Sequence, residues 1–112
     1  MNIIKKSRED LSKKELYFLL TDPQIQKMGD LEDTEINIKD FVEYEDISKS
    51  TGEIYTVISV ITDLGTFATN SKTFIECFER IVECFGSDFN TIKVFKGTSN
   101  KGRKFLQCSY VN

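Results

Sequence analysis

Apolar residues recur with a helical period in two stretches of the chain. The longer stretch runs from residue 74 to residue 85, where the apolar positions form one continuous stripe (Phe74, Cys77, Phe78, Ile81, Val82 and Phe85). Ser71 or Thr73 can cap its start, and Gly86 stands where a left-handed residue commonly ends a helix. The pattern predicts one well-formed amphipathic helix whose apolar face plugs a core.

The shorter stretch lies near the N-terminus. Ser12 and Glu15 have the spacing of a capping box, and apolar residues follow at positions 16, 17, 19 and 20. Asp22-Pro23 should end this helix, because the residue before a proline is disfavoured in helical conformation. Residues 24–28 are predicted to form one further turn ended by Gly29. No element is predicted for residues 1–11, which are a candidate disordered segment.

Elsewhere the apolar residues follow a period of two or are rich in β-branched types, which is typical of strands. A meander of three strands is predicted over residues 36–44, 53–62 and 66–69, with turns at 48–52 and 63–65. A closing hairpin is predicted over residues 91–98 and 104–111, with its turn at Asn100-Lys101-Gly102.

The resulting element order predicts a mainly β (α+β) fold in a single domain. A short helix comes first, then three strands, a helix and two strands. This is the order of the OB-fold, a five-stranded Greek-key barrel with a helix between strands 3 and 4. Another kind of five-stranded α+β sheet is the alternative.

Composition narrows the class of protein. A chain of 112 residues fits one domain. It lacks histidine, the commonest general base and zinc ligand, so composition disfavours an enzyme, and no cofactor is expected. Three cysteines without metal-type spacing fit a reducing, cytoplasmic location. No apolar run is long enough to span a membrane, and residues 1–14 do not form a signal peptide.

Charge is distributed unevenly along the chain. Residues 1–88 hold all eighteen acidic residues beside ten basic ones, a net charge of −8. Residues 89–112 carry no acidic residue and five basic ones, namely Lys93, Lys96, Lys101, Arg103 and Lys104. Such asymmetry indicates a local basic surface, although a solvated strand face gives the same pattern.

Aromatic residues lie beside these cations. Single-strand binding needs flat rings on which bases stack and cations that follow the phosphates. If Ile92 and Val94 face the core, Lys93 and Phe95 face outward together, since side chains alternate along a strand. Tyr44 and Tyr55 flank the first hairpin and are candidates for the same groove. On the last strand, residues 106, 108 and 110 form one face and residues 105, 107 and 109 the other, and the pattern does not decide which is outside.

Several short motifs carry a resemblance that covers residues 16–111. They are Tyr44-Glu45-Asp46, Ile58–Thr62, Thr69–Phe74, Lys96–Ser99, Gly102–Phe105 and Cys108-Ser109-Tyr110. The chain resembles a family of small single-stranded DNA-binding proteins of phages and conjugative elements of Gram-positive bacteria. The resemblance implies an OB-type fold that protects replication or transfer intermediates, with replication proteins as candidate partners. Ser109–Asn112 depart from the familiar cellular single-strand binders, because they carry no acidic tail.

The leading hypothesis is therefore a non-enzymatic protein that binds single-stranded DNA without strong sequence preference. Its candidate binding residues are Tyr44, Tyr55, Lys72, Lys93, Phe95, Lys96, Lys101, Arg103 and Lys104. Two rival hypotheses use the acidic segment from Asp30 to Asp46. One is a phage-type interaction module that inhibits a host protein, and the other is a nuclease that holds a metal ion with these carboxylates.

Overall fold

The strand β3 organises the architecture of the protein. The computed structural model describes residues 2–7, 10–21, 24–86 and 91–111. Its elements are β1 (Asn2–Lys6), α1 (Lys13–Thr21), β2 (Gln26–Lys27), the short 3-10 helix η1 (Met28–Leu31), β3 (Thr34–Ile47), β4 (Ile54–Thr62), β5 (Gly65–Thr69), α2 (Lys72–Phe85), β6 (Thr91–Thr98) and β7 (Lys104–Tyr110). Residues 34–37 of β3 pair with β6 and residues 38–47 pair with β4, with a break in register between Ile38 and Asp40.

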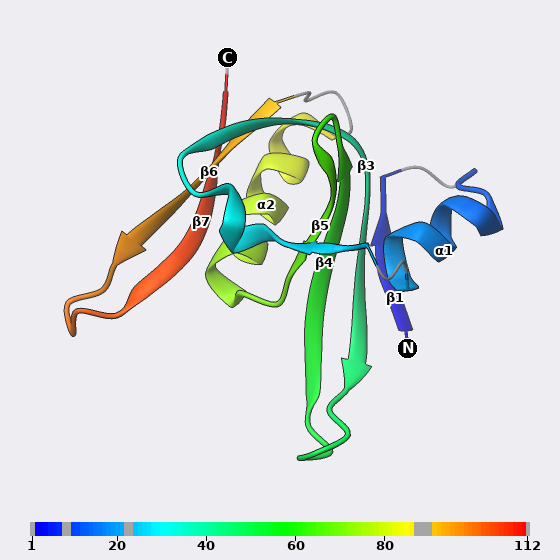
Figure 1. The fold of residues 1–112 in the computed structure, drawn as a ribbon, viewed down its shortest axis with the longest axis horizontal. Helices are drawn as coiled ribbons and strands as arrows, with labels where there is room; N and C mark the ends of the chain where they lie inside the picture. Colours follow the sequence, from blue (N-terminus) through cyan, green and yellow to red (C-terminus); the bar gives the residue numbers. More distant parts are fainter. Residues whose placement is uncertain (1, 8–9, 22–23, 87–90, 112) are drawn as a thin grey trace.

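The described strands form one curled, open sheet in the order β2-β5-β4-β3-β6-β7, with β1 also paired to β3. The curl carries the β6–β7 hairpin away from β3–β4–β5, and α2 lies between the two arms (Figure 1). The mainly β, barrel-like class is thus confirmed, as are the five predicted strands. The five predicted strands do not close into a barrel. β5 pairs with β2 and β4, and β7 pairs with β6, so β5 and β7 do not pair with each other.

Helix α2 supplies the core that the apolar stripe predicts. The Ser71 hydroxyl caps its start by accepting a hydrogen bond from the Phe74 N–H at 3.4 Å. Gly86 ends it with a positive φ of 64°, and its N–H donates to the Val82 carbonyl. Phe74 and Phe78 are almost completely buried, and the Phe78 ring meets Phe41 of β3 edge to face, with ring centroids 5.0 Å apart. Burial of such rings is a main source of stability in a domain of this size.

Helix α1 packs on the face of the sheet that α2 leaves free. The predicted cap at Ser12 forms: the Glu15 N–H donates to the Ser12 hydroxyl at 3.1 Å, and that hydroxyl donates to the Glu15 carboxylate at 3.0 Å. A second apolar cluster joins this end of the chain to β3 and β4 (Leu11, Leu19, Val42, Tyr44 and Val57). The predicted helix stop at Asp22-Pro23 lies outside the described residues.

Two predictions about the N-terminal third are wrong. Asn2–Lys6 form the strand β1 rather than a disordered segment, because β3 offers them an unpaired edge at residues 42–45. The Ser7 hydroxyl secures the end of β1 by donating to Asp40 at 2.9 Å and accepting from the Phe41 N–H at 3.1 Å. In place of a turn over residues 24–28 ended by Gly29, β2 pairs in parallel with β5, and η1 contains Gly29.

Candidate nucleic-acid interface

One face of the β6–β7 hairpin points away from α2, and we call it the outer face (Lys93, Phe95, Gly97, Phe105, Gln107 and Ser109). Ile92 and Val94 are completely buried in the core, so the residues between them point the other way. Lys93 is exposed and Phe95 is half-buried. Lys93 and Phe95 therefore lie on the same face of the strand, as predicted, but the Phe95 side chain is only partly exposed.

The structure also decides which face of the last strand is outside. Leu106 and Cys108 are buried, whereas Phe105, Gln107 and Ser109 are half-buried on the outer face. Phe105 stands opposite Gly97 in the register of the hairpin. Its ring lies across Gly97 so closely that a Cβ atom at position 97 would come within 2.7 Å of the Phe105 Cζ. Two phenylalanine rings thus share one face beside Lys93.

Sequence reasoning assigned no binding role to Phe105, Gly97 or Gln107. The signal was present in the chain, because a turn at residues 100–102 sets the register that places Phe105 opposite Gly97. The turn itself closes through the Ser99 N–H, which donates to the Arg103 carbonyl at 2.8 Å, and through Gly102 at a φ of 78°. Counting back from this turn places both rings on one face.

The tip of the same hairpin is cationic. Lys101, Arg103 and Lys104 are all exposed there. Along the strands, carboxylates accompany the cations: Lys93 stands opposite Glu35 of β3, and the Lys96 Nζ lies 3.5 Å from the Glu32 Oε2. Lys96 is in phase with Val94 and therefore lies on the opposite side of the strand from Phe95. Lys101, Arg103 and Lys104 at the tip, by contrast, form no ion pair with the residues that the structure describes.

Tyr44 and Tyr55 do not line a groove together. Tyr44 is only 8% exposed because it packs in the second apolar cluster beside Leu19 of α1. Burial, with smaller contributions from Tyr55 and Asp46, raises the pKa of its hydroxyl. The candidate stacking role of Tyr44 is corrected on this ground, since α1 covers its ring. Tyr55 is 38% exposed.

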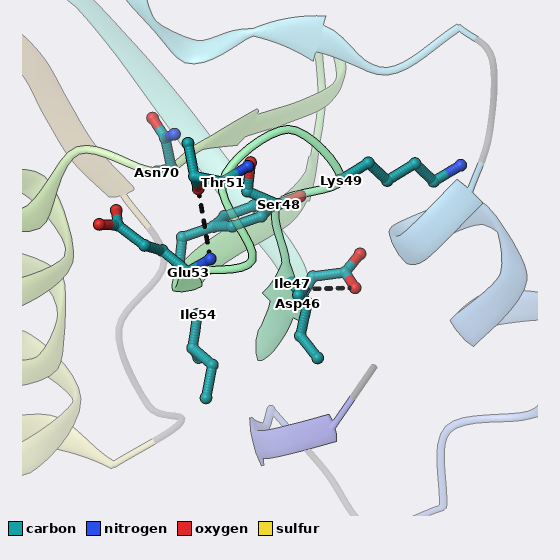
Figure 2. A pocket seen from close by; sticks show the side chains of 9 residues that line it. Asp46, Ile47, Ser48, Lys49, Thr51, Glu53, Ile54 and Asn70 are labelled. Carbon is teal, nitrogen blue, oxygen red and sulfur yellow. Dashed lines mark hydrogen bonds between the residues drawn. The ribbon is translucent and has the colours of Figure 1, made fainter.

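Tyr55 borders two hollows. One lies at the β3–β4 hairpin, where Figure 2 shows Asn70, from the segment between β5 and α2, close to Thr51 and Glu53. There the Glu53 N–H donates to the Thr51 hydroxyl at 3.2 Å, which shapes the turn. The other hollow, of about 450 Å³, lies at the opening of the sheet, between β4, β5 and Leu106 of β7 (we call it the opening groove). Lys27 lines the opening groove, so it places a cation beside a ring at a site that the sequence did not indicate.

Lys72 belongs to a different surface. It begins α2 and lines a pocket with Glu43, Glu76 and Glu79, which contains no residue of β6 or β7. The structure therefore brings Lys93, Phe95, Lys101, Arg103 and Lys104 onto one hairpin, with Lys96 on its inner side, and leaves Lys72 apart from them.

Other chemistry finds little support in the part of the chain that the structure describes. No group of three Asp, Glu or Cys side chains there gathers closely enough to hold a metal ion. Burial, and secondarily the neighbouring Cys77, raises the pKa of the Cys108 thiol, which keeps it protonated and unreactive. None of the helices among these residues has the length and apolar character to cross a bilayer.

Comparison of the chain with protein-family models, with curated proteins and with solved structures found no match. The functional assignment therefore depends on the residues and geometry of this chain.

Proposed function

We propose that the protein binds single-stranded DNA without strong sequence preference, through the outer face and the cationic tip of the β6–β7 hairpin. It acts by binding and not by catalysis, and protects replication or transfer intermediates of a phage or mobile element. The observation that carries the proposal is the pairing of two half-buried phenylalanine rings, Phe95 and Phe105, with Lys93 on one strand face.

The strand order supports the proposal. If β1 and β2 are left aside, β3 to β7 correspond in chain order to the five strands of an OB barrel, and α2 lies between the third and the fourth. Their order in the sheet, β5-β4-β3-β6-β7, is that of an OB barrel opened between its third and fifth strands. OB-folds are partly open barrels that bind oligonucleotides through the face of strands 2 and 3 and through the loops that join strands 1 to 2 and 4 to 5. In this protein the corresponding strands are β4 and β5, which line the opening groove, and the corresponding loops are the β3–β4 hairpin and the β6–β7 hairpin with its cationic tip (Figure 1).

The physical roles follow from the chemistry of a single strand. Aromatic rings stack on bases of any identity, which gives affinity without sequence preference. Lys101, Arg103 and Lys104 at the tip contact phosphates and release counterions, so binding weakens as salt rises. The carboxylates Glu32 and Glu35 lower the affinity at low salt, because they compete with phosphate for Lys96 and Lys93.

The first test is a fluorescence-anisotropy titration of labelled oligo-dT and of a matched duplex at two salt concentrations. We expect binding to the single strand and not to the duplex, with lower affinity at the higher salt. Because each stacked base contributes about 1–3 kcal/mol, Phe95→Ala should weaken binding roughly 5- to 150-fold. Tyr17→Ala is the matched control, since Tyr17 is an exposed aromatic residue on α1.

Two outcomes would reject the proposal. One is the absence of binding to either strand form at low salt. The other is an unchanged affinity for oligo-dT when both Phe95 and Phe105 are replaced in a folded variant.

A further inference from the structure

The β3–β4 hairpin extends beyond the end of α2 (Figure 1), so α2 covers only part of the hairpin face that carries Ile58. Three cross-strand pairs follow one another along this face: Glu43 with Ile58, Glu45 with Thr56, and Ile47 with Ile54. Ile58 is fully buried under α2, whereas Ile47 and Ile54 are 59% and 66% exposed. Two large apolar side chains standing side by side in water are a feature of interaction surfaces.

A pocket of about 420 Å³ lies at the point where α2 leaves this face, and we call it the acidic groove. Ile4 of β1 borders it and is 46% exposed. Glu43 and Thr56 come from the hairpin, and Ile75, Glu76 and Glu79 come from α2. The groove therefore has apolar walls and carboxylates between them, and exposed isoleucines continue beyond it.

The carboxylates of the groove form an unusual pair. Glu43 is only 6% exposed and shares a hydrogen bond with Glu79 across the space between β3 and α2. Burial, followed by that hydrogen bond and the charge of Glu79, raises the pKa of Glu43 to about 7, while Lys5 of β1 acts in the opposite direction. The neighbouring Glu79 thus makes ionisation of Glu43 less favourable, and a cation close to the two side chains would make it more favourable. The other charged groups of this surface are Lys72, Glu76 and Glu45.

We propose that the acidic groove is a docking site for a segment of a protein partner that combines lysine or arginine with apolar side chains. The cationic side chain enters between Glu43 and Glu79, and the apolar side chains cover Ile4, Ile47 and Ile54. Charge complementarity selects this occupant, since the groove holds three carboxylates against the single cation Lys72 in its lining. A single strand of DNA is excluded from it by the same carboxylates. The site is independent of the proposed DNA interface.

The occupant replaces the proton of Glu43. The cationic side chain is most strongly bound when Glu43 is ionised, so binding below about pH 7 must release the proton from Glu43. Affinity is therefore expected to rise as pH increases toward 7 and to level off above it. The steepest rise that one released proton allows is about tenfold per pH unit.

The test uses the full chain and a short fluorescent peptide of alternating leucine and lysine, with its leucine–glutamate counterpart as the charge-reversed probe. We expect saturable binding of the leucine–lysine peptide only, with affinity increasing from pH 5.5 toward pH 7. Glu79→Gln, and separately the double substitution of Ile47→Ser and Ile54→Ser, should each weaken it at least about fivefold, the effect of about 1 kcal/mol. These side chains lie at the surface, so the variants should keep the fold.

Matched controls are Glu35→Gln and Leu64→Ser, which change an exposed carboxylate and an exposed apolar side chain outside the groove. They should leave peptide binding unchanged, and the groove variants should leave the affinity for oligo-dT unchanged. Backbone amide signals of residues 43–56 and 72–79 should shift on adding the peptide. Equal binding of both peptides, or equal affinity in the groove variants and the controls, would overturn the proposal.

Discussion

The ring of Phe105 lies directly over Gly97 on the neighbouring strand, where a Cβ atom would meet the Phe105 Cζ at 2.7 Å. Gly97 has an ordinary extended backbone, so glycine is not needed there for its conformation. It is needed because it has no side chain, which leaves room for the Phe105 ring. A glycine inside a strand commonly marks such a close approach. The outer face is flat at this point because the ring fills the space that a side chain would occupy.

Gly97→Ala should therefore displace Phe105 and Gln107. We expect a loss of about 1–3 kcal/mol in the free energy of unfolding, the usual cost of forcing a side chain into a filled space. Urea denaturation measures the change. Gly29→Ala is the control, since a Cβ there meets nothing within 4 Å, and equal losses in the two variants would refute the packing argument.

The carboxylates beside the basic strand should oppose DNA binding. Glu32→Gln removes the partner of Lys96, and Glu35→Gln removes the charge opposite Lys93. We expect each to tighten binding of oligo-dT at low salt by a factor of about two to five, with the gain disappearing at high salt because exposed charges are screened. Anisotropy at several salt concentrations measures this. Glu83→Gln, an exposed carboxylate on α2, should have no such effect.

The two tyrosines of β3 and β4 should behave differently. Tyr55→Ala removes an exposed ring that borders the opening groove, and we expect weaker binding of oligo-dT, by roughly fivefold or more. Tyr44→Phe keeps a buried ring under α1 and should leave the affinity unchanged. Both rings lie on the same face of the sheet, so a larger effect of Tyr44→Phe than of Tyr55→Ala would show that DNA reaches the part of that face under α1.

Stability should depend on pH through Glu43. Its pKa is about 7 in the folded protein against an ordinary value of 4.5, so the folded state holds a proton that the unfolded state releases between these values. The free energy of unfolding should therefore fall as pH rises from 4.5 to 7, by up to about 3 kcal/mol. Urea denaturation at several pH values measures it. Glu43→Gln should flatten this part of the profile, and a slope that persists in the variant would place its origin elsewhere.

Ser59 offers a test of buried polarity. It is fully buried on β4, and among the described residues its hydroxyl is a buried side-chain oxygen without a hydrogen-bond partner. An unsatisfied buried hydroxyl costs about 1–3 kcal/mol. Ser59→Ala should therefore leave the protein as stable as before or more stable, as thermal unfolding would show. A clear loss of stability would mean that the hydroxyl has a partner, such as a water molecule.

Features that depend only on residues close together in the sequence could be predicted from the sequence. The stripe of α2, the Ser12 cap of α1 and the turns of both hairpins depend on neighbours within a few residues, and the structure confirms them. The alternation around Ile92 and Val94 likewise placed Lys93 and Phe95 on one face.

Features that depend on distant partners were missed. Asn2–Lys6 and Gln26–Lys27 have no apolar pattern of their own, and they become strands because β3 and β5 offer them hydrogen-bonding edges. Tyr44 was misread for the same reason, since residues 41–44 of β3 are buried on both faces by two different helices. The alternation of residues along β3 does not reveal that a second helix covers its other face.

The placement of β1 has a consequence for how the chain resists aggregation. β6 pairs with β3 only over residues 34–37, and β1 continues along that same edge over residues 42–45. An exposed strand edge of this kind is a template on which other molecules add strands. Lys5 and Lys6 lie in the strand that covers it, and lysine on an outermost strand discourages stacking of further chains. The N-terminal strand thus covers the middle of the longest strand of the protein at an edge that would otherwise be open to pairing with another chain.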